Sequence, residues 1–195
     1  MFIQMIQGKV SDPEGVRRQF DRWTSELRSG ATGFLGGTGG LTEDGQCFLA
    51  ARFESPEAAQ TNSERPEQSE WWAETEKYFD GPVDFTDTTD IDVQLEPSND
   101  AKFVQIIQSR VLDRPKVEEL TPKFIAAAGD RPDVVGALTI WSGDRATDLI
   151  YFTSEADARA AEQKEQPDMQ PLMEELQAAI DPDVKYLDLK DPWIT

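Results

Sequence analysis

The sequence predicts an α+β protein made of two consecutive copies of one βαββαβ unit. Its first segment returns 101 positions later: over the fifteen pairs from Phe2/Phe103 to Val16/Val117, seven residues are identical. Later landmarks recur in the same order: Arg52-Phe53-Glu54-Ser55 matches Tyr151-Phe152-Thr153-Ser154, and Arg65-Pro66-Glu67 matches Gln166-Pro167-Asp168. A tandem duplication of a unit of about a hundred residues explains both observations.

The first half is expected to form four strands and two helical regions. An apolar strand comes first, and Asp12 followed by Pro13 is typical of a helix start. Thr42-Glu43-Asp44-Gly45 predicts a hairpin turn, Ser55-Pro56 a second helix start, and Gly81-Pro82 its end. In order, the expected elements are strand Phe2–Val10, helix Pro13–Ser29, strands Gly33–Leu41 and Gln46–Phe53, helix Glu57–Phe79 broken near Pro66, and strand Val83–Val93.

The second half repeats this order. Its expected elements are strand Phe103–Val111, helix Pro115–Ala128, strands Val134–Trp141 and Asp148–Phe152, helix Glu155–Ile180 interrupted at Pro167, and strand Val184–Leu189. The expected organisation is one repeat over residues 1–95, a polar linker over 96–101 and a second repeat over 102–195. A βαββαβ unit is the ferredoxin-like arrangement, whose sheet carries helices on one face only. Two copies can therefore pack sheet to sheet as a pseudo-dimer within one chain.

Composition excludes several classes of function. The net charge of −19 argues against nucleic-acid and anionic-membrane partners, because both require positive potential. No apolar stretch is long enough for a transmembrane helix, and no signal peptide is recognisable at the N-terminus. The single cysteine, Cys47, cannot form an intramolecular disulfide. We therefore expect a cytoplasmic protein.

The chain contains no histidine, which removes histidine-dependent catalysis, His-ligated haem and His-containing zinc sites. We expect no metal and no cofactor. Two superficially suggestive motifs are set aside. The glycines of 36–40 lead into a hairpin, so they lack the context of a phosphate loop. The acidic run of Asp84, Asp87, Asp90 and Asp92 lacks the glycine and terminal glutamate of a calcium loop, and a solvated edge is favoured.

Residues Phe53–Ser63 carry a resemblance to a known family. The chain resembles two fused copies of the dimeric α+β barrel superfamily, which includes the antibiotic-biosynthesis-monooxygenase-like proteins. In that superfamily a strand ends in an aromatic residue and a helix then carries a polar residue about one turn in, where Asn62 stands here. The resemblance implies cofactor-free oxygenases, haem degraders, isomerases or stress proteins, and the lack of histidine argues against the haem branches.

The candidate ligand-binding residues, concentrated in the first half, are Gln4, Trp23, Arg52, Asn62, Trp71 and Trp72. Each has an alternative structural role. A buried glutamine is commonly satisfied by other polar groups, and most tryptophans are core residues. Trp71 and Trp72 point about 100° apart on a helix, so one of them must leave the core face. Arg52 either reaches solvent or anchors a polar ligand group.

Two functions follow from these observations. The first is binding of a small aromatic molecule by a cofactor-free monooxygenase, with Arg52, Asn62 and a tryptophan orienting the substrate. The alternative is a non-catalytic binding or stress-response protein. We expect any ligand-sized pocket in the first half, between its sheet and the Glu57–Phe79 helices, because the polar groups concentrate there. The internal pseudo-dimer also predicts a monomer or a weak homodimer.

Overall fold

The computed structural model describes residues 1–163 and 169–195, which form two compact units. The first unit is Met1–Ile91 together with Leu189–Thr195, and the second is Asp92–Asp188. The division therefore falls a few residues before the expected 96–101 linker, and the C-terminal residues return to the first unit. The expected helix interruption at Pro167 and the matching segment 166–168 lie outside the described residues.

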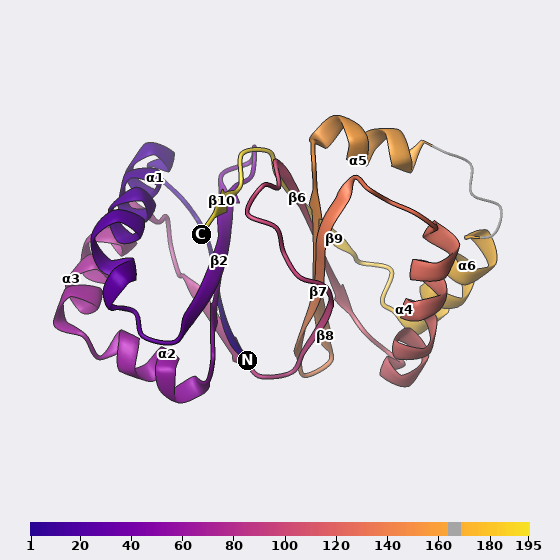
Figure 1. Cartoon of the computed structure of the whole chain (residues 1–195), viewed down its shortest axis with the longest axis horizontal. Coiled ribbons are helices and arrows are strands. Elements are labelled where there is room, and N and C mark those ends of the chain that lie inside the picture. The colour runs from indigo at the N-terminus through magenta and orange to yellow at the C-terminus, as the bar shows by residue number, and fades with distance from the viewer. Residues whose placement is uncertain (164–168) are drawn as a thin grey trace. The chain divides into compact units, whose positions relative to one another are not determined.

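The first unit is a five-stranded sheet with helices on one face (Figure 1). Its strands run in the order β10-β2-β3-β1-β4, and β3 pairs antiparallel with both β1 and β2. The strands are β1 (Phe2–Lys9), β2 (Phe34–Leu41), β3 (Gln46–Phe53), β4 (Asp84–Thr88) and β10 (Trp193–Ile194). The helices are α1 (Pro13–Arg22), α2 (Pro56–Ser63) and α3 (Pro66–Thr75).

Local chemistry explains where these helices begin and end. Asp12 accepts a hydrogen bond from the Gly15 amide at 3.0 Å, which caps α1 as predicted. The helix expected to continue to Ser29 instead leaves α-geometry after Arg22, passing through a π-helical turn over Trp23–Leu27. At this junction the hydroxyl of Thr24 donates to the carbonyl of Phe20, a back-bond of the kind that bends helices.

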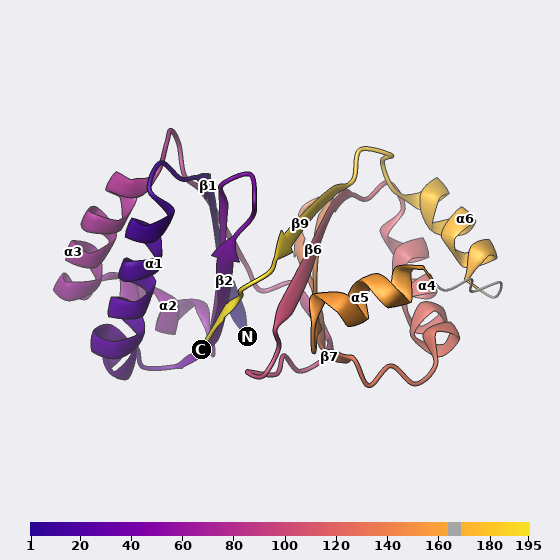
Figure 2. The same ribbon diagram turned by 90° about the horizontal axis from the view of Figure 1, so that it is seen from above.

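Two apolar clusters hold the helices of the first unit to its sheet. One gathers the buried side chains Val10, Val16, Cys47 and Trp193, and the other gathers Trp23, Leu27, Ala31 and Trp71. Figure 2 shows α1 and α3 running side by side over the sheet that these clusters cover.

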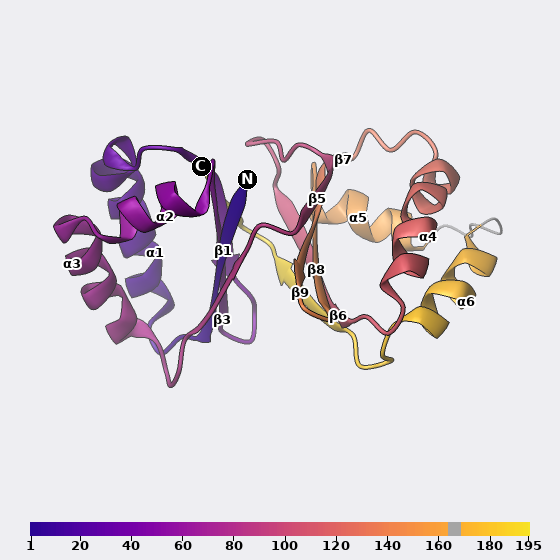
Figure 3. The ribbon, with the colours of Figure 1, turned by 90° about the horizontal axis from the view of Figure 1, so that it is seen from below.

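The second unit repeats this architecture, with strands in the order β5-β7-β8-β6-β9. Strand β8 pairs antiparallel with both β6 and β7. The strands are β5 (Ile91–Leu95), β6 (Phe103–Arg110), β7 (Val134–Ser142), β8 (Arg145–Phe152) and β9 (Lys185–Leu189). The helices are α4 (Arg114–Ala128), α5 (Glu155–Glu162) and α6 (Gln170–Ala179), and α4 lies beside α6 in Figure 3.

The predicted α+β class and the two ferredoxin-like repeats are confirmed. The four repeat strands of each unit follow one order, β2-β3-β1-β4 in the first and β7-β8-β6-β9 in the second. One expected strand is wrong: Val83–Val93 is two strands, β4 in the first sheet and β5 in the second. The chain turns between them, where the Asp90 amide donates to the Thr88 hydroxyl at 3.0 Å.

Candidate functional site

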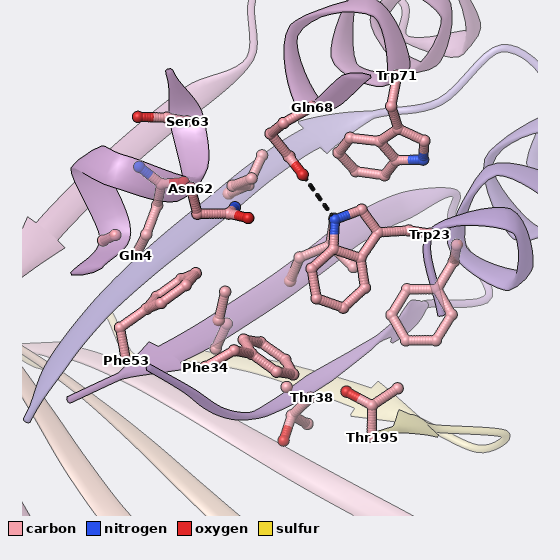
Figure 4. A pocket seen from close by; sticks show the side chains of 17 residues that line it. Gln4, Trp23, Phe34, Thr38, Phe53, Asn62, Ser63, Gln68, Trp71 and Thr195 are labelled. Atoms are coloured by element: carbon pink, nitrogen blue, oxygen red, sulfur yellow. Dashed lines mark hydrogen bonds between the residues drawn. The ribbon is translucent and has the colours of Figure 1, made fainter. Parts of the chain in front are cut away.

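The first unit contains a small cavity between its sheet and its helices (Figure 4). Its volume is about 100 Å³, which corresponds to roughly three water molecules. Four of the six predicted ligand-binding residues line it: Gln4, Trp23, Asn62 and Trp71.

The two tryptophans of this cavity already have hydrogen-bond partners. The Trp23 indole nitrogen donates to Gln68 Oε1 at 2.8 Å, a bond visible in Figure 4. The Trp71 indole nitrogen donates to the Gln19 carbonyl at 2.8 Å. Both side chains belong to the buried apolar cluster that holds α3, so their structural role is established.

The two amides are also engaged. Asn62, whose residue is 6% exposed, accepts a hydrogen bond from Arg65 Nη1 at 2.9 Å. Gln4 donates to Asp87 Oδ1 at 3.0 Å across the β1–β4 edge. Because these atoms are bound by the protein itself, fewer polar groups remain to orient a ligand.

The other two predicted residues do not line this cavity. Successive strand residues point to opposite faces, and Phe53, the neighbour of Arg52, lines the cavity beneath the helices. Arg52 therefore points to the face of the first sheet that carries no helix. Trp72 packs edge-on against Phe85, with ring centroids 5.1 Å apart. Trp72 is only partly buried, but it also packs against the apolar cluster that contains Trp71, with the two ring centroids 6.0 Å apart, so the two tryptophans do not serve separate faces.

A much larger cavity, of about 1160 Å³, lies in the second unit between its sheet and helices α4 and α6. The expectation that the larger pocket lies in the first half is therefore wrong. Side-chain size accounts for a small part of the difference, and the placement of the helices over the sheet must account for the rest. Trp23 and Trp71 occupy the space in the first unit, whereas the matching sequence positions in the second are Phe124 and Leu172.

An acidic residue lies on the floor of this larger cavity. Asp148 is at the centre of β8, between Ala146 and Ile150, which line the same cavity on the same strand face. Its Oδ1 accepts a hydrogen bond from the Thr139 hydroxyl at 2.6 Å. Burial raises the pKa of this carboxyl to about 6, and the Thr139 hydrogen bond opposes the shift. Near neutral pH the carboxylate is charged in a poorly solvated place.

Polar groups from neighbouring strands surround Asp148. Gln94 Nε2 on β5 donates to the Thr139 hydroxyl at 3.3 Å, so that a chain of donors leads to the carboxylate. The Trp141 indole nitrogen on β7 donates to Asp92 Oδ2 at 2.8 Å. All of these residues line the cavity, which otherwise has mainly apolar walls. This combination of apolar walls and few polar groups is typical of small-molecule sites.

Sequence reasoning missed Asp148 because it placed the start of the strand there, where an acidic residue is unremarkable. The strand begins at Arg145, so Asp148 is an internal residue facing the helices. A signal was available: the strand pattern of the first repeat has Leu49 at the matching position. A carboxylate replacing a leucine at an inward position indicates a specific role or a specific partner.

Comparisons of the whole structure with solved structures show the fold. A candidate monooxygenase from Fusobacterium nucleatum superposes with a TM-score of 0.78 at 11% identity, over 99% of this chain and 93% of that chain. A candidate monooxygenase from Lactobacillus acidophilus gives 0.73 at 10% identity, over 100% and 98%. An anthrone oxidase-like protein gives 0.67 at 8% identity, over 100% and 92%.

The chain therefore has the dimeric α+β barrel fold, with its two ferredoxin-like repeats in tandem in one chain. No protein-family model matches the sequence, and the comparison with curated proteins finds no match. Among the described residues, no helix has the length and apolarity needed to cross a membrane. Within the same residues, no group of three acidic or cysteine side chains is placed to hold a metal ion.

Proposed function

We propose that this dimeric α+β barrel protein binds a small aromatic molecule in the large cavity of its second unit. The cavity carries the proposal: its volume of about 1160 Å³ suits a polycyclic ligand, whereas the first cavity, at about 100 Å³, does not. This assigns the site to the half opposite the one that the sequence favoured. Under this proposal, Arg52, Asn62 and the first-half tryptophans stabilise the structure and do not bind the ligand.

We further propose that the bound molecule is oxidised by dioxygen without a cofactor. Support comes from solved structures of the same fold that are named as monooxygenases or as anthrone oxidase-like. An apolar cavity that excludes water suits an electron-rich aromatic substrate, which supplies the electrons itself. For anthrone the balance is one anthrone and one dioxygen giving one anthraquinone and one water.

Binding is tested with N-phenyl-1-naphthylamine, a neutral aromatic probe that fluoresces in apolar surroundings. The matched variants are Ala137→Trp, which places an indole against the β7 wall of the second cavity and obstructs it, and Ala59→Trp, which fills the first. We expect the wild type and Ala59→Trp to bind the probe and Ala137→Trp to lose most of the signal, with circular dichroism showing that both variants are folded. Equal binding by all three proteins would refute the assigned site.

Catalysis is tested by oxygen uptake and anthraquinone absorbance with anthrone, after subtraction of spontaneous oxidation. Turnover that Ala137→Trp abolishes and Ala59→Trp retains supports the monooxygenase. Probe binding without oxygen uptake for anthrone and related phenols favours the alternative, a non-catalytic binding protein of the same fold. The large apolar cavity is compatible with that alternative, which makes the oxygen measurement decisive between the two.

A further inference from the structure

The charged residues that line the large cavity are all acidic. Its described lining contains three carboxylates, those of Asp92, Glu118 and Asp148, and no lysine or arginine. Arg114 lies over the ring of the wall residue Trp141, but it is already paired with Glu118, so an anionic ligand would enter this cavity against like charge. A cationic ligand would be attracted by the acidic lining.

The three carboxylates differ in whether a positive charge neutralises them. Glu118 on α4 already forms an ion pair with Arg114, with Nε and Oε1 2.7 Å apart. Asp92 and Asp148 instead accept hydrogen bonds from neutral donors, the Trp141 indole and the Thr139 hydroxyl. Neutral donors orient a carboxylate but leave its charge in place. Asp148 on the central strand β8 and Asp92 at an exposed position of the edge strand β5 therefore line the cavity with no ion pair among the described residues.

Asp148 has an oxygen available to a ligand. The Thr139 hydroxyl donates to Oδ1, and Oδ1 is the only carboxylate oxygen of Asp148 with a hydrogen bond to a described residue. The residue lines the cavity, so Oδ2 is the acceptor left for a molecule bound there. Thr139 is itself held by Gln94, and this support fixes the carboxylate in one orientation.

We propose that the large cavity selects molecules that join an aromatic body to a protonated amine, and that Asp148 Oδ2 accepts the ammonium hydrogen bond. The inference rests on the proposed function, because it assumes that this cavity is the ligand site. The ammonium supplies the positive charge that the cavity wall lacks, and the aromatic body contacts the apolar side chains of α4, β7 and β8. A buried charge pair of this kind gives selectivity against neutral and anionic analogues.

The pH dependence follows from the two partners. The carboxyl of Asp148 has a pKa of about 6, so it is a charged acceptor only above that pH. The ammonium of a primary alkylamine loses its proton near pH 10. Affinity should therefore rise as pH increases through about 6 and fall again near the pKa of the amine. The other titratable groups that face the cavity are Asp92 on β5, Glu118 on α4 and Tyr186 on β9.

The test uses three probes with the same ring: the cation 2-(1-naphthyl)ethylammonium, the neutral 2-(1-naphthyl)ethanol and the carboxylate anion of 1-naphthaleneacetic acid. Each is titrated by calorimetry into the full chain near pH 7.5. We expect the amine to bind at least about tenfold more tightly than the alcohol, and the acetate to bind most weakly. At about pH 5 the advantage of the amine over the alcohol should shrink.

Two substitutions at Asp148 separate charge from shape. Asp148→Asn keeps the acceptor for Thr139, and Asp148→Leu places the residue of the first repeat there. Both should weaken amine binding by about tenfold or more while leaving the alcohol within about twofold. Asp84→Asn removes one negative charge from a strand of the first unit and should leave all three affinities unchanged.

The outcomes are distinguishable. Equal affinity for the amine and the alcohol, or no effect of either Asp148 substitution, overturns the amine inference while the aromatic site stands. Tighter binding of the acetate overturns it as well. Failure of all three probes to bind overturns both the inference and the assignment of the large cavity as the ligand site.

Discussion

Leu49 and Asp148 occupy the same position in the two repeats. Leu49 lies opposite Ile6 in the β1–β3 pair, and Asp148 lies opposite Ile107 in the equivalent β6–β8 pair. Each lines the cavity of its own unit beneath the helices. One repeat thus has an apolar floor under a small cavity, and the other has a carboxylate under a large one.

The carboxyl of Asp148 should cost the protein stability at neutral pH. Its pKa in the folded state, about 6, lies above the value of about 3.9 expected in the unfolded chain. Between these two pKa values the folded state binds more protons than the unfolded chain does. This group therefore lowers the free energy of unfolding as pH rises. The destabilisation is complete above about pH 6. Asp148→Asn should therefore raise the free energy of unfolding at about pH 8, by up to about 3 kcal/mol. Urea denaturation measures this, and the gain should be smaller at about pH 5; a variant less stable than the wild type at both pH values contradicts the assignment.

Cys47 should not react with thiol reagents in the native protein. The residue is 1% exposed, and burial raises the pKa of its thiol to about 12, so hardly any thiolate forms near pH 8. A disulfide reagent such as Ellman's should give almost no colour until guanidinium chloride unfolds the chain. It should then report one thiol. Rapid labelling of the folded protein would mean that the cluster of Val10, Val16 and Trp193 opens readily.

Asn62→Ala should reduce stability more than ligand binding. Asn62 accepts from Arg65, whose side chain is 17% exposed, and the same Arg65 nitrogen donates to the Leu27 carbonyl at 3.2 Å. Removing one acceptor from a largely buried guanidinium should cost about 1–3 kcal/mol in the free energy of unfolding. The control is Ser63→Ala at the exposed neighbouring position, which should cost less than about 1 kcal/mol. Binding of N-phenyl-1-naphthylamine should not change in either variant, and a loss of binding in Asn62→Ala alone would return the site to the first half.

Gly136 should tolerate no side chain. A Cβ at this position would lie 2.7 Å from Pro97 Cα and 2.9 Å from the Tyr151 ring, and backbone atoms cannot move aside as a flexible side chain does. Gly136→Ala should therefore lower the free energy of unfolding by about 1–3 kcal/mol. Gly40→Ala is the matched strand control, because its new Cβ would come no closer than 3.2 Å, to the flexible Leu189 side chain. If thermal unfolding shows the same small effect for both, the close approach of β7 to Pro97 is wrong.

The fold could be predicted from sequence because each sequence pattern that indicates a helix, strand or turn occurs twice, once in each repeat. The repeated strand at Phe2 and Phe103, the capping residues and the hairpin turns each recur, and the observed elements follow them. The split of Val83–Val93 was missed because a polar turn within a strand-like stretch has no distinctive pattern. Polar residue types indicated the first-half cavity, but the sequence does not reveal which hydrogen bonds already satisfy them.

The size of each cavity could not be predicted for a different reason. Empty volume depends on how Trp23 and Trp71 fill the space under their helices, and this depends on rotamers and helix placement in three dimensions. The importance of Asp148 depends likewise on the strand starting at Arg145, and strand boundaries are poorly encoded in sequence.

The site itself is tested most directly by a crystal structure of the full chain soaked with 6-bromo-2-naphthol, a neutral, electron-rich aromatic whose bromine gives an anomalous signal. We predict a bromine peak within the second unit, between α4 and the β7–β8 pair, with the ring near Asp148. A peak in the first-unit cavity beside Trp23 and Asn62, or bromine only on the protein surface, would contradict the assignment.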